Sequence, residues 1–406
     1  MIYYADSIIL YIIITICILF AIISYFAIQL IPSRRSDIKD LYSEGMDYLL
    51  AGDIQSAYKV FKTVVKEDTD NIKAYMRLGQ VIRDGGKPEK ALKIHKTLLV
   101  RKGLSKYLRI EIYKNLALDY YSIGDLYQSI EQFKKILVID KKNEWTYSYL
   151  IRIYRELDDW TKAGEYFERF IKIQGKDDNH KRSLYMIQEG RVLLRKEKFL
   201  ESREKFENAI VIDESIAIAY YFIGNSYSKE SDYLFNQGGD NLVASEDNNK
   251  NPLDMAKDKL SKAVPMWIKY AAMKPEQSWM VIHLLKDALF ALDRYDEFEG
   301  LLKNILELDP GNIEAIANLA DIYYNRGETR DAIGLIDDAF ERGQDSLLFR
   351  LTRMKLYTKE KQNPKDITKE LDKLINFLVQ DERFQVYKNT ATDDDILWLY
   401  ETGGES

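Results

Sequence analysis

The side chains that most often perform catalysis or bind metals are few in this sequence and lie far apart. The chain has 406 residues but contains one cysteine and three histidines: Cys17, His95, His180 and His283. One cysteine excludes an intrachain disulfide framework and any multi-cysteine zinc or iron–sulfur site. The sequence also lacks a nucleophile motif and a phosphate-binding glycine loop. We therefore expect no enzyme activity, no metal, no cofactor and no small-molecule substrate.

Charged residues are abundant but nearly balanced. The 59 basic and 65 acidic side chains give a formal net charge of −6, which provides no general attraction to nucleic acid. Three adjacent aspartates, Asp393 to Asp395, could hold only a hard cation and only loosely. Such a run is more typical of a solvated turn or a helix N-terminal cap.

Arginine is the residue with binding chemistry that recurs most regularly along the chain. The recurrent positions are Arg83, Arg152, Arg155, Arg191 and Arg195. A guanidinium is a planar, bidentate donor for carboxylate or phosphate groups, and arginine and tyrosine are typical anchors of protein interfaces. Whether these side chains can act together depends on the elements that position them.

A repeating pattern of large and small residues predicts those elements. Its clearest example is Tyr113, Leu116, Ala117, Tyr120, Gly124 and Phe133. Seven or eight segments follow the same order in register, with a period of about 34 residues, which is typical of tetratricopeptide repeats. Each repeat is a pair of antiparallel helices, so we predict an all-α chain folded as a right-handed α-solenoid. An armadillo-like array of longer period is the alternative, and the spacing fits it poorly.

The repeat register places the recurrent arginines on one surface. In tetratricopeptide repeats, positions 2, 5, 9, 12 and 13 of the first helix line a concave groove. We name the predicted partner-binding residues at these positions the arginine stripe: Arg83, Tyr121, Arg152, Arg155, Arg191, Arg195 and Asn225. The alternative is that these arginines pair with neighbouring carboxylates such as Glu156 and Glu189. His95 stands where the pattern expects phenylalanine, which favours a packed, hydrogen-bonded core histidine.

The N-terminus carries a long apolar run. No charged residue occurs from Ser7 to Ile31, and about 25 residues of helix are enough to span a bilayer core. Basic residues follow the run, whereas only Asp6 precedes it. The positive-inside rule then places the rest of the chain in the cytoplasm. We predict a single-pass transmembrane helix through residues 7–31.

Several residues in the early repeats resemble one particular family. The string Lys66-Glu-Asp-Thr69, Leu78-Gly79, Arg83, Gly86 and Ile94-His95, followed by Asp119-Tyr120 and Gly124, is similar to the lipopolysaccharide assembly protein B (LapB) family. The resemblance covers about residues 42–175. It implies a cytoplasmic repeat domain anchored in the inner membrane, acting as a non-enzymatic adaptor. The implied partners are a membrane AAA protease and its client, a deacetylase of lipid A synthesis.

The C-terminal tail departs from that family. Members end in a ribbon with two Cys-x-x-Cys pairs, whereas residues 381–406 contain neither cysteine nor histidine. This departure favours an alternative function as a general tetratricopeptide scaffold for another membrane complex.

The predicted organisation has five parts. They are a transmembrane anchor (1–32), a basic linker (33–40), repeats (41–345), capping helices (346–380) and a degenerate tail (381–406). A polar, Gly/Asn-rich insertion at about 236–252 interrupts the sixth repeat, and we expect it to be a surface loop.

Overall fold

The computed structural model describes residues 15–16, 18–24, 34–240, 251–343, 347–359, 369 and 373–374. These residues form helices and no strand, which confirms the all-helical, tetratricopeptide-like fold. The chain divides into two compact units, residues 1–153 and 154–406, which are described separately.

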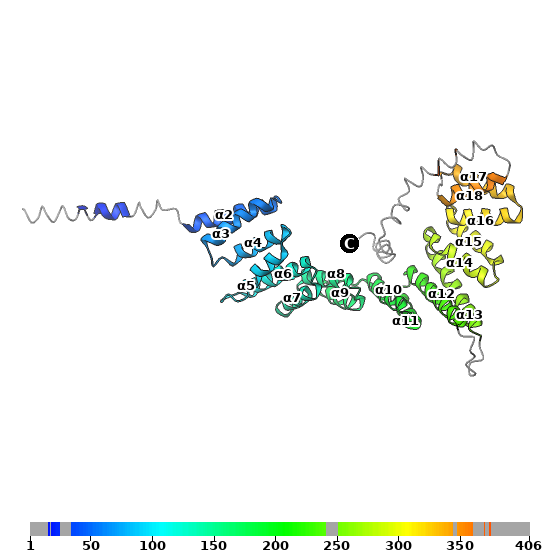
Figure 1. The fold of residues 1–406 in the computed structure, drawn as a ribbon, viewed down its shortest axis with the longest axis horizontal. Helices are drawn as coiled ribbons and strands as arrows, with labels where there is room; N and C mark the ends of the chain where they lie inside the picture. Colours follow the sequence, from blue (N-terminus) through cyan, green and yellow to red (C-terminus); the bar gives the residue numbers. More distant parts are fainter. Residues whose placement is uncertain are drawn as a thin grey trace, which may run out of the picture. The chain divides into compact units, whose positions relative to one another are not determined.

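The first unit is a succession of helix pairs (Figure 1). Each pair is an antiparallel hairpin, and the second helix of one pair packs on the first helix of the next. The pairs are α2 (Arg34–Leu50) with α3 (Ile54–Glu67), α4 (Ile72–Asp84) with α5 (Pro88–Leu98), and α6 (Lys106–Ile123) with α7 (Leu126–Ile139). Helix α8 (Glu144–Glu156) crosses the boundary between the units.

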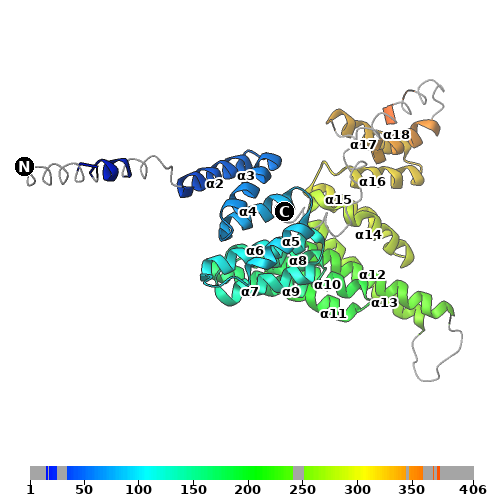
Figure 2. The ribbon, with the colours of Figure 1, turned by 60° about the vertical axis from the view of Figure 1, so that its left-hand side comes forward.

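The second unit continues with the same hairpins (Figure 2). Its first helices are α9 (Trp160–Gln174), α10 (Asn179–Arg195), α11 (Phe199–Ile212), α12 (Ala217–Asp240) and α13 (Pro252–Met273). After the short 3-10 helix η1 (Pro275–Gln277) come α14 (Trp279–Ala291), α15 (Asp296–Leu308), α16 (Ile313–Arg326), α17 (Thr329–Glu341) and α18 (Leu347–Lys359).

Short turns between the paired helices recur with the repeat period. Each of these turns contains one residue in the left-handed backbone region, where glycine is favoured because it has no Cβ. Glycine takes this conformation at positions 52, 86, 124 and 327. Three other turns use a residue with a Cβ in the same left-handed conformation, with φ between 57° and 59°: Asp158, Glu197 and Asp293. Aspartate or asparagine then caps many of the helix N-termini, as Asp125 does by accepting a hydrogen bond from the Gln128 N–H.

The paired helices approach closely where a glycine faces a large buried ring. A Cβ built on Gly79 would lie 2.3 Å from His95 Nε2. A Cβ on Gly224 would similarly lie 2.4 Å from Trp267 Nε1. The second contact joins α12 to α13, the two helices on either side of the insertion. The core is therefore built from small-to-large contacts within each hairpin.

The predicted anchor lies mostly outside the described residues. Within it, residues 15–16 and 18–24 are helical, and their large apolar side chains, such as Ile16 and Phe20, are exposed. No helix in the described ranges is both long and apolar enough to cross a membrane.

Two other predicted segments lie partly or largely outside the described residues. Helix α12 continues to Asp240 and α13 begins at Pro252, so the first five residues of the predicted 236–252 loop are helical. Most of the capping segment beyond α18, and the whole tail from 381 to 406, are outside the described ranges. The predicted domain boundaries remain predictions.

Candidate protein-interaction surface

A buried ionic array joins the second and third repeats. Asp119 on α6 is fully buried, and its carboxylate is hydrogen-bonded to the side chains of Arg83 and His95. Arg83 of α4 donates to Asp119 Oδ1 at 3.0 Å, and His95 Nδ1 of α5 lies 2.5 Å from Asp119 Oδ2. Asp119 therefore connects three helices through one carboxylate.

His95 makes a polar contact through each of its two ring nitrogens. Its Nδ1 faces the Asp119 carboxylate, and its Nε2 lies 3.1 Å from the backbone carbonyl of Met76. These two contacts confirm the prediction of a packed, hydrogen-bonded core histidine.

This array changes the interpretation of Arg83, the first member of the arginine stripe. Its side chain is only 9% exposed, and it pairs with Asp119 and also approaches Asp84. Arg83 thus has little surface to offer a partner. Several residues that carry the family resemblance, namely Gly79, Arg83, His95 and Asp119, lie in or against this internal array.

Two stripe residues of the second unit, Arg155 and Arg195, also have internal contacts. Arg195 pairs with Asp158 at the turn after α8, and Asp158 accepts a hydrogen bond from Trp160 Nε1 at 2.7 Å. The Arg155 guanidinium lies over the Trp160 ring, 5.8 Å from its centroid. These contacts organise a turn whose central residue, Asp158, has a positive φ.

The other two stripe residues of the second unit, Arg191 and Asn225, also make contacts within that unit. Arg191 is 5% exposed, donates to Gln188 and lies 4.9 Å from the centroid of the Phe222 ring. Asn225 accepts a hydrogen bond from Trp267 Nε1 at 3.0 Å. Arg83 and Arg195 therefore form ion pairs inside the protein, which was the alternative to binding a partner protein. Their carboxylates are Asp119 and Asp158, and not the Glu156 and Glu189 given as examples from the sequence.

Tyr121 and Arg152, in the first unit, belong to a different arrangement. Their side chains lie beside aromatic rings that are not part of the arginine stripe. Tyr121 meets Tyr149 edge-on with 6.4 Å between ring centroids, and the Arg152 guanidinium lies 5.5 Å from the Tyr149 centroid. The Trp145 ring lies 4.4 Å from Tyr149, and the Lys114 ammonium lies 4.3 Å from the centroid of Trp145. We name these five residues of α6 and α8 the α6–α8 patch: Lys114, Tyr121, Trp145, Tyr149 and Arg152.

Part of the α6–α8 patch could have been found from the sequence. Lys114 occupies position 5 of the third repeat, and Trp145 occupies position 2 of the fourth. Both positions line the groove in the register that selected Tyr121 and Arg152. The arginine stripe is defined mainly by arginine, so a lysine and a tryptophan at equivalent positions fall outside it. Tyr149 lies at position 6, so its membership depends on side-chain direction and not on register alone.

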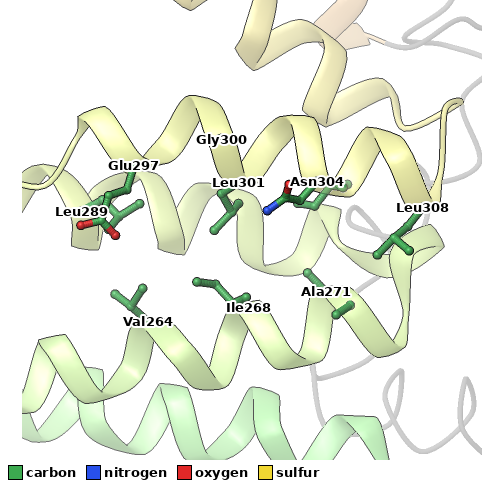
Figure 3. Close-up of a pocket in the computed structure, with 11 residues that line it drawn as sticks. Val264, Ile268, Ala271, Leu289, Glu297, Gly300, Leu301, Asn304 and Leu308 are labelled. Carbon is green, nitrogen blue, oxygen red and sulfur yellow. The ribbon is translucent and has the colours of Figure 1, made fainter.

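An apolar groove of about 370 Å³ lies between α13 and α15 in the second unit (Figure 3). Val264 and Ile268 extend from α13 toward Leu301 and Asn304 on α15. Glu297 and Asn304 are the polar members of its lining. It contains no cluster of titratable groups that would indicate chemistry.

The other histidine–carboxylate contact has a structural role. His180 Nδ1 lies 2.8 Å from Asp213 Oδ2, and the Ser215 hydroxyl donates to Asp213 Oδ1 at 2.6 Å. Burial raises the pKa of Asp213, but the hydrogen bonds from Ser215 and His180 outweigh it and leave this pKa below its usual value. Because Ser215 is bound to the aspartate and not to the histidine, the three residues do not form a nucleophile–base pair. No metal-binding cluster of His, Cys, Asp or Glu occurs among the residues with described positions.

Comparisons with known proteins agree with the repeat fold and the family resemblance. A tetratricopeptide repeat family model matches residues 289–353. The chain is 29% identical over 136 residues to lipopolysaccharide assembly protein B of Escherichia coli K12, covering 34% of this chain and 35% of that protein. It is 22% identical over 202 residues to the protein of the same name from Haemophilus influenzae, covering 47% of this chain and 50% of that protein.

The matched region is thus a third to a half of these relatives' own length. Among solved structures, a tetratricopeptide repeat protein from Parabacteroides merdae aligns over 67% of this chain and 98% of its own, with 16% identity and a TM-score of 0.34. The chain thus matches the tetratricopeptide repeat model at residues 289–353 and is similar, over about a third of its length, to lipopolysaccharide assembly protein B.

Proposed function

We propose that this chain is a membrane-tethered, non-enzymatic adaptor that captures protein partners on its repeats and acts in lipopolysaccharide assembly. The observation that supports it best is the α6–α8 patch, where Lys114 and Arg152 are held over aromatic rings. Neither cation makes an ion pair with another residue in the described ranges. Aromatic and arginine side chains of this kind are typical anchors of protein interfaces.

The tether rests on the apolar run from Ser7 to Ile31. The described helical residues in this run expose Ile16, Leu19 and Phe20, each with more than half of its surface accessible. Exposed apolar side chains on consecutive helical turns are costly in water and favourable in lipid. The basic residues after the run orient the repeats toward the cytoplasm, at the inner membrane.

The assignment to lipopolysaccharide assembly rests on the similarity to lipopolysaccharide assembly protein B. In this proposal the partners are a membrane protease and its client in envelope lipid synthesis. A general scaffold for another membrane complex is the second candidate, favoured by the absence of cysteine from the tail.

Depletion of the protein from its own cells separates the two candidates. We expect the amount of lipid A per cell, and the abundance of the deacetylase that commits its precursors, to change on depletion. The full chain should restore both, whereas a chain lacking residues 1–32 should leave the membrane fraction and restore neither. Unchanged lipid A and deacetylase after depletion would reject the lipopolysaccharide role and favour the general scaffold.

A further inference from the structure

We propose that the α6–α8 patch recognises an acidic, extended segment of a partner protein. The inference rests on the proposed adaptor function and specifies the chemistry of the partner. It follows from two observations: aromatic rings position Lys114 and Arg152, and neither cation forms an ion pair with another described residue.

Lys114 is a positioned cation with unused donors. Its ammonium lies 4.3 Å from the Trp145 ring centroid, and it has no hydrogen bond or ion pair with any other described residue. A cation–π contact fixes the ammonium without neutralising its charge, so its N–H groups remain available to a carboxylate. Glu111 precedes Lys114 by one helical turn, yet the two do not come within the 4.0 Å of an ion pair.

Arg152 is the second positioned cation. Its side chain is exposed, its guanidinium lies 5.5 Å from the Tyr149 ring centroid, and none of its donors is hydrogen-bonded within the described part of the chain. This distinguishes it from Arg83 and Arg195, which are paired with Asp119 and Asp158. A guanidinium in this state offers a bidentate site for a carboxylate.

The rings between the two cations form a rigid floor. Trp145 and Tyr149 are half-buried and rest on the fully buried Phe133, whose centroid lies 5.6 Å and 5.4 Å from theirs. Because these side chains are already ordered by packing, a partner loses little of its binding energy to ordering them. The exposed parts of the rings suit the aliphatic side chains of an extended peptide.

Charge complementarity therefore selects a peptide with carboxylates separated by apolar residues. Nucleic acid is a poorer fit, because phosphate backbones are bound by longer series of basic residues and the chain carries a net charge of −6.

The test uses the full chain in non-ionic detergent and two fluorescein-labelled dodecapeptides. One alternates aspartate with leucine, and the other replaces every aspartate with asparagine. We expect fluorescence anisotropy to show at least about tenfold tighter binding of the aspartate peptide, since charge-assisted hydrogen bonds are about twice as strong as neutral ones. The double variant Lys114→Ala/Arg152→Ala should lose that preference. The matched variant Lys141→Ala/Lys142→Ala removes the same charge from exposed positions of the same unit and should keep it.

A second readout locates the peptide. Binding should change the tryptophan fluorescence of the wild-type chain, and Trp145→Phe, which keeps an aromatic floor, should remove that change. Equal binding of both peptides, tighter binding of a thymidine dodecanucleotide, or an unaltered preference in Lys114→Ala/Arg152→Ala would each overturn the inference. These outcomes are distinct from failure of the proposed function, which is measured as lipid A in depleted cells and does not use a peptide.

Discussion

Asp119 joins the second and third repeats through a buried carboxylate. It is fully buried and is the shared carboxylate of Arg83 and His95. Asp119→Asn would leave the largely buried Arg83 guanidinium facing a neutral amide. Because removing one partner of a buried ionic group leaves an uncompensated charge, we expect a loss of about 3 kcal/mol in the free energy of unfolding.

Urea unfolding followed by helical circular dichroism measures this loss. Asp70→Asn makes the same chemical change at an exposed position and should alter the free energy of unfolding by less than about 0.5 kcal/mol. Equal stability of the two variants would show that the array contributes nothing to packing.

Tyr185 provides a pH-dependent test in the second unit. Burial raises the pKa of its phenol to about 12, against a partial lowering by Arg155. Between pH 10 and 12 the unfolded chain would ionise this phenol while the folded chain keeps it protonated, so the stability contributed by the neutral group is lost as pH rises. A shift of one pKa unit corresponds to about 1.4 kcal/mol, so the wild type should lose about 3 kcal/mol more than Tyr185→Phe over this range.

The phenylalanine variant keeps the ring that packs 4.9 Å from Phe167 and removes only the titrating hydroxyl. Urea titrations of both proteins at pH 9 and pH 12 give the comparison. Parallel pH profiles would mean that the Tyr185 hydroxyl is not sheltered from water.

At the residue scale, the sequence predicts whether a single position is buried, but it does not predict which two distant side chains form a pair. The repeat pattern marks position 95 as a core site, and His95 is indeed buried and hydrogen-bonded. The repeat pattern does not say which side chains bond to each other. It therefore does not predict that Arg83 pairs with Asp119, which lies 36 residues further along the chain. The arginine stripe rests on repeat register alone, and register does not reveal which arginines already pair with a carboxylate inside the protein.

The helical hairpin depends on close approach between small and large residues, and Gly224 tests this directly. A methyl group at this position would lie 2.4 Å from Trp267 Nε1, too close for a van der Waals contact. We expect Gly224→Ala to destabilise the second unit by about 2 kcal/mol, because overpacking a tight contact forces side chains or backbone to move. Urea unfolding measures the change.

Gly334→Ala is the matched control, since it lies inside α17 with no atom within 4 Å of the added methyl. Alanine is favoured over glycine in a helix by about 1 kcal/mol, so this variant should be slightly more stable than wild type. If Gly224→Ala were stabilised to the same degree, the α12–α13 contact would not be close in solution.

At the element scale, the repeat period predicted helices and turns well because both depend on local residues. Most turn glycines and aspartate caps occur where the pattern expects them. The exceptions are positions where tertiary contacts override local preference. Asp158 keeps a left-handed backbone although it is not glycine, and its carboxylate is bound by Trp160 and Arg195. Helix α12 also extends five residues into the predicted loop, beyond the last residue of the repeat pattern.

At the scale of the whole molecule, the proposed adaptor has two separable parts: an N-terminal tether and a repeat surface that captures a partner. The similarity to lipopolysaccharide assembly protein B covers about a third of the chain, and residues 381–406 contain no cysteine. The proposed role therefore depends on the repeats, and the α6–α8 patch is the surface that should carry it.

The most direct measurement is the lipid A content of cells depleted of the chromosomal protein and supplied with a Lys114→Glu/Arg152→Glu variant. If the α6–α8 patch captures the partner, the variant should reach the membrane in normal amount but fail to restore the lipid A content that the wild-type chain restores. The matched Lys141→Glu/Lys142→Glu variant should restore it fully. Full restoration by Lys114→Glu/Arg152→Glu would contradict the claim that this surface carries the adaptor function.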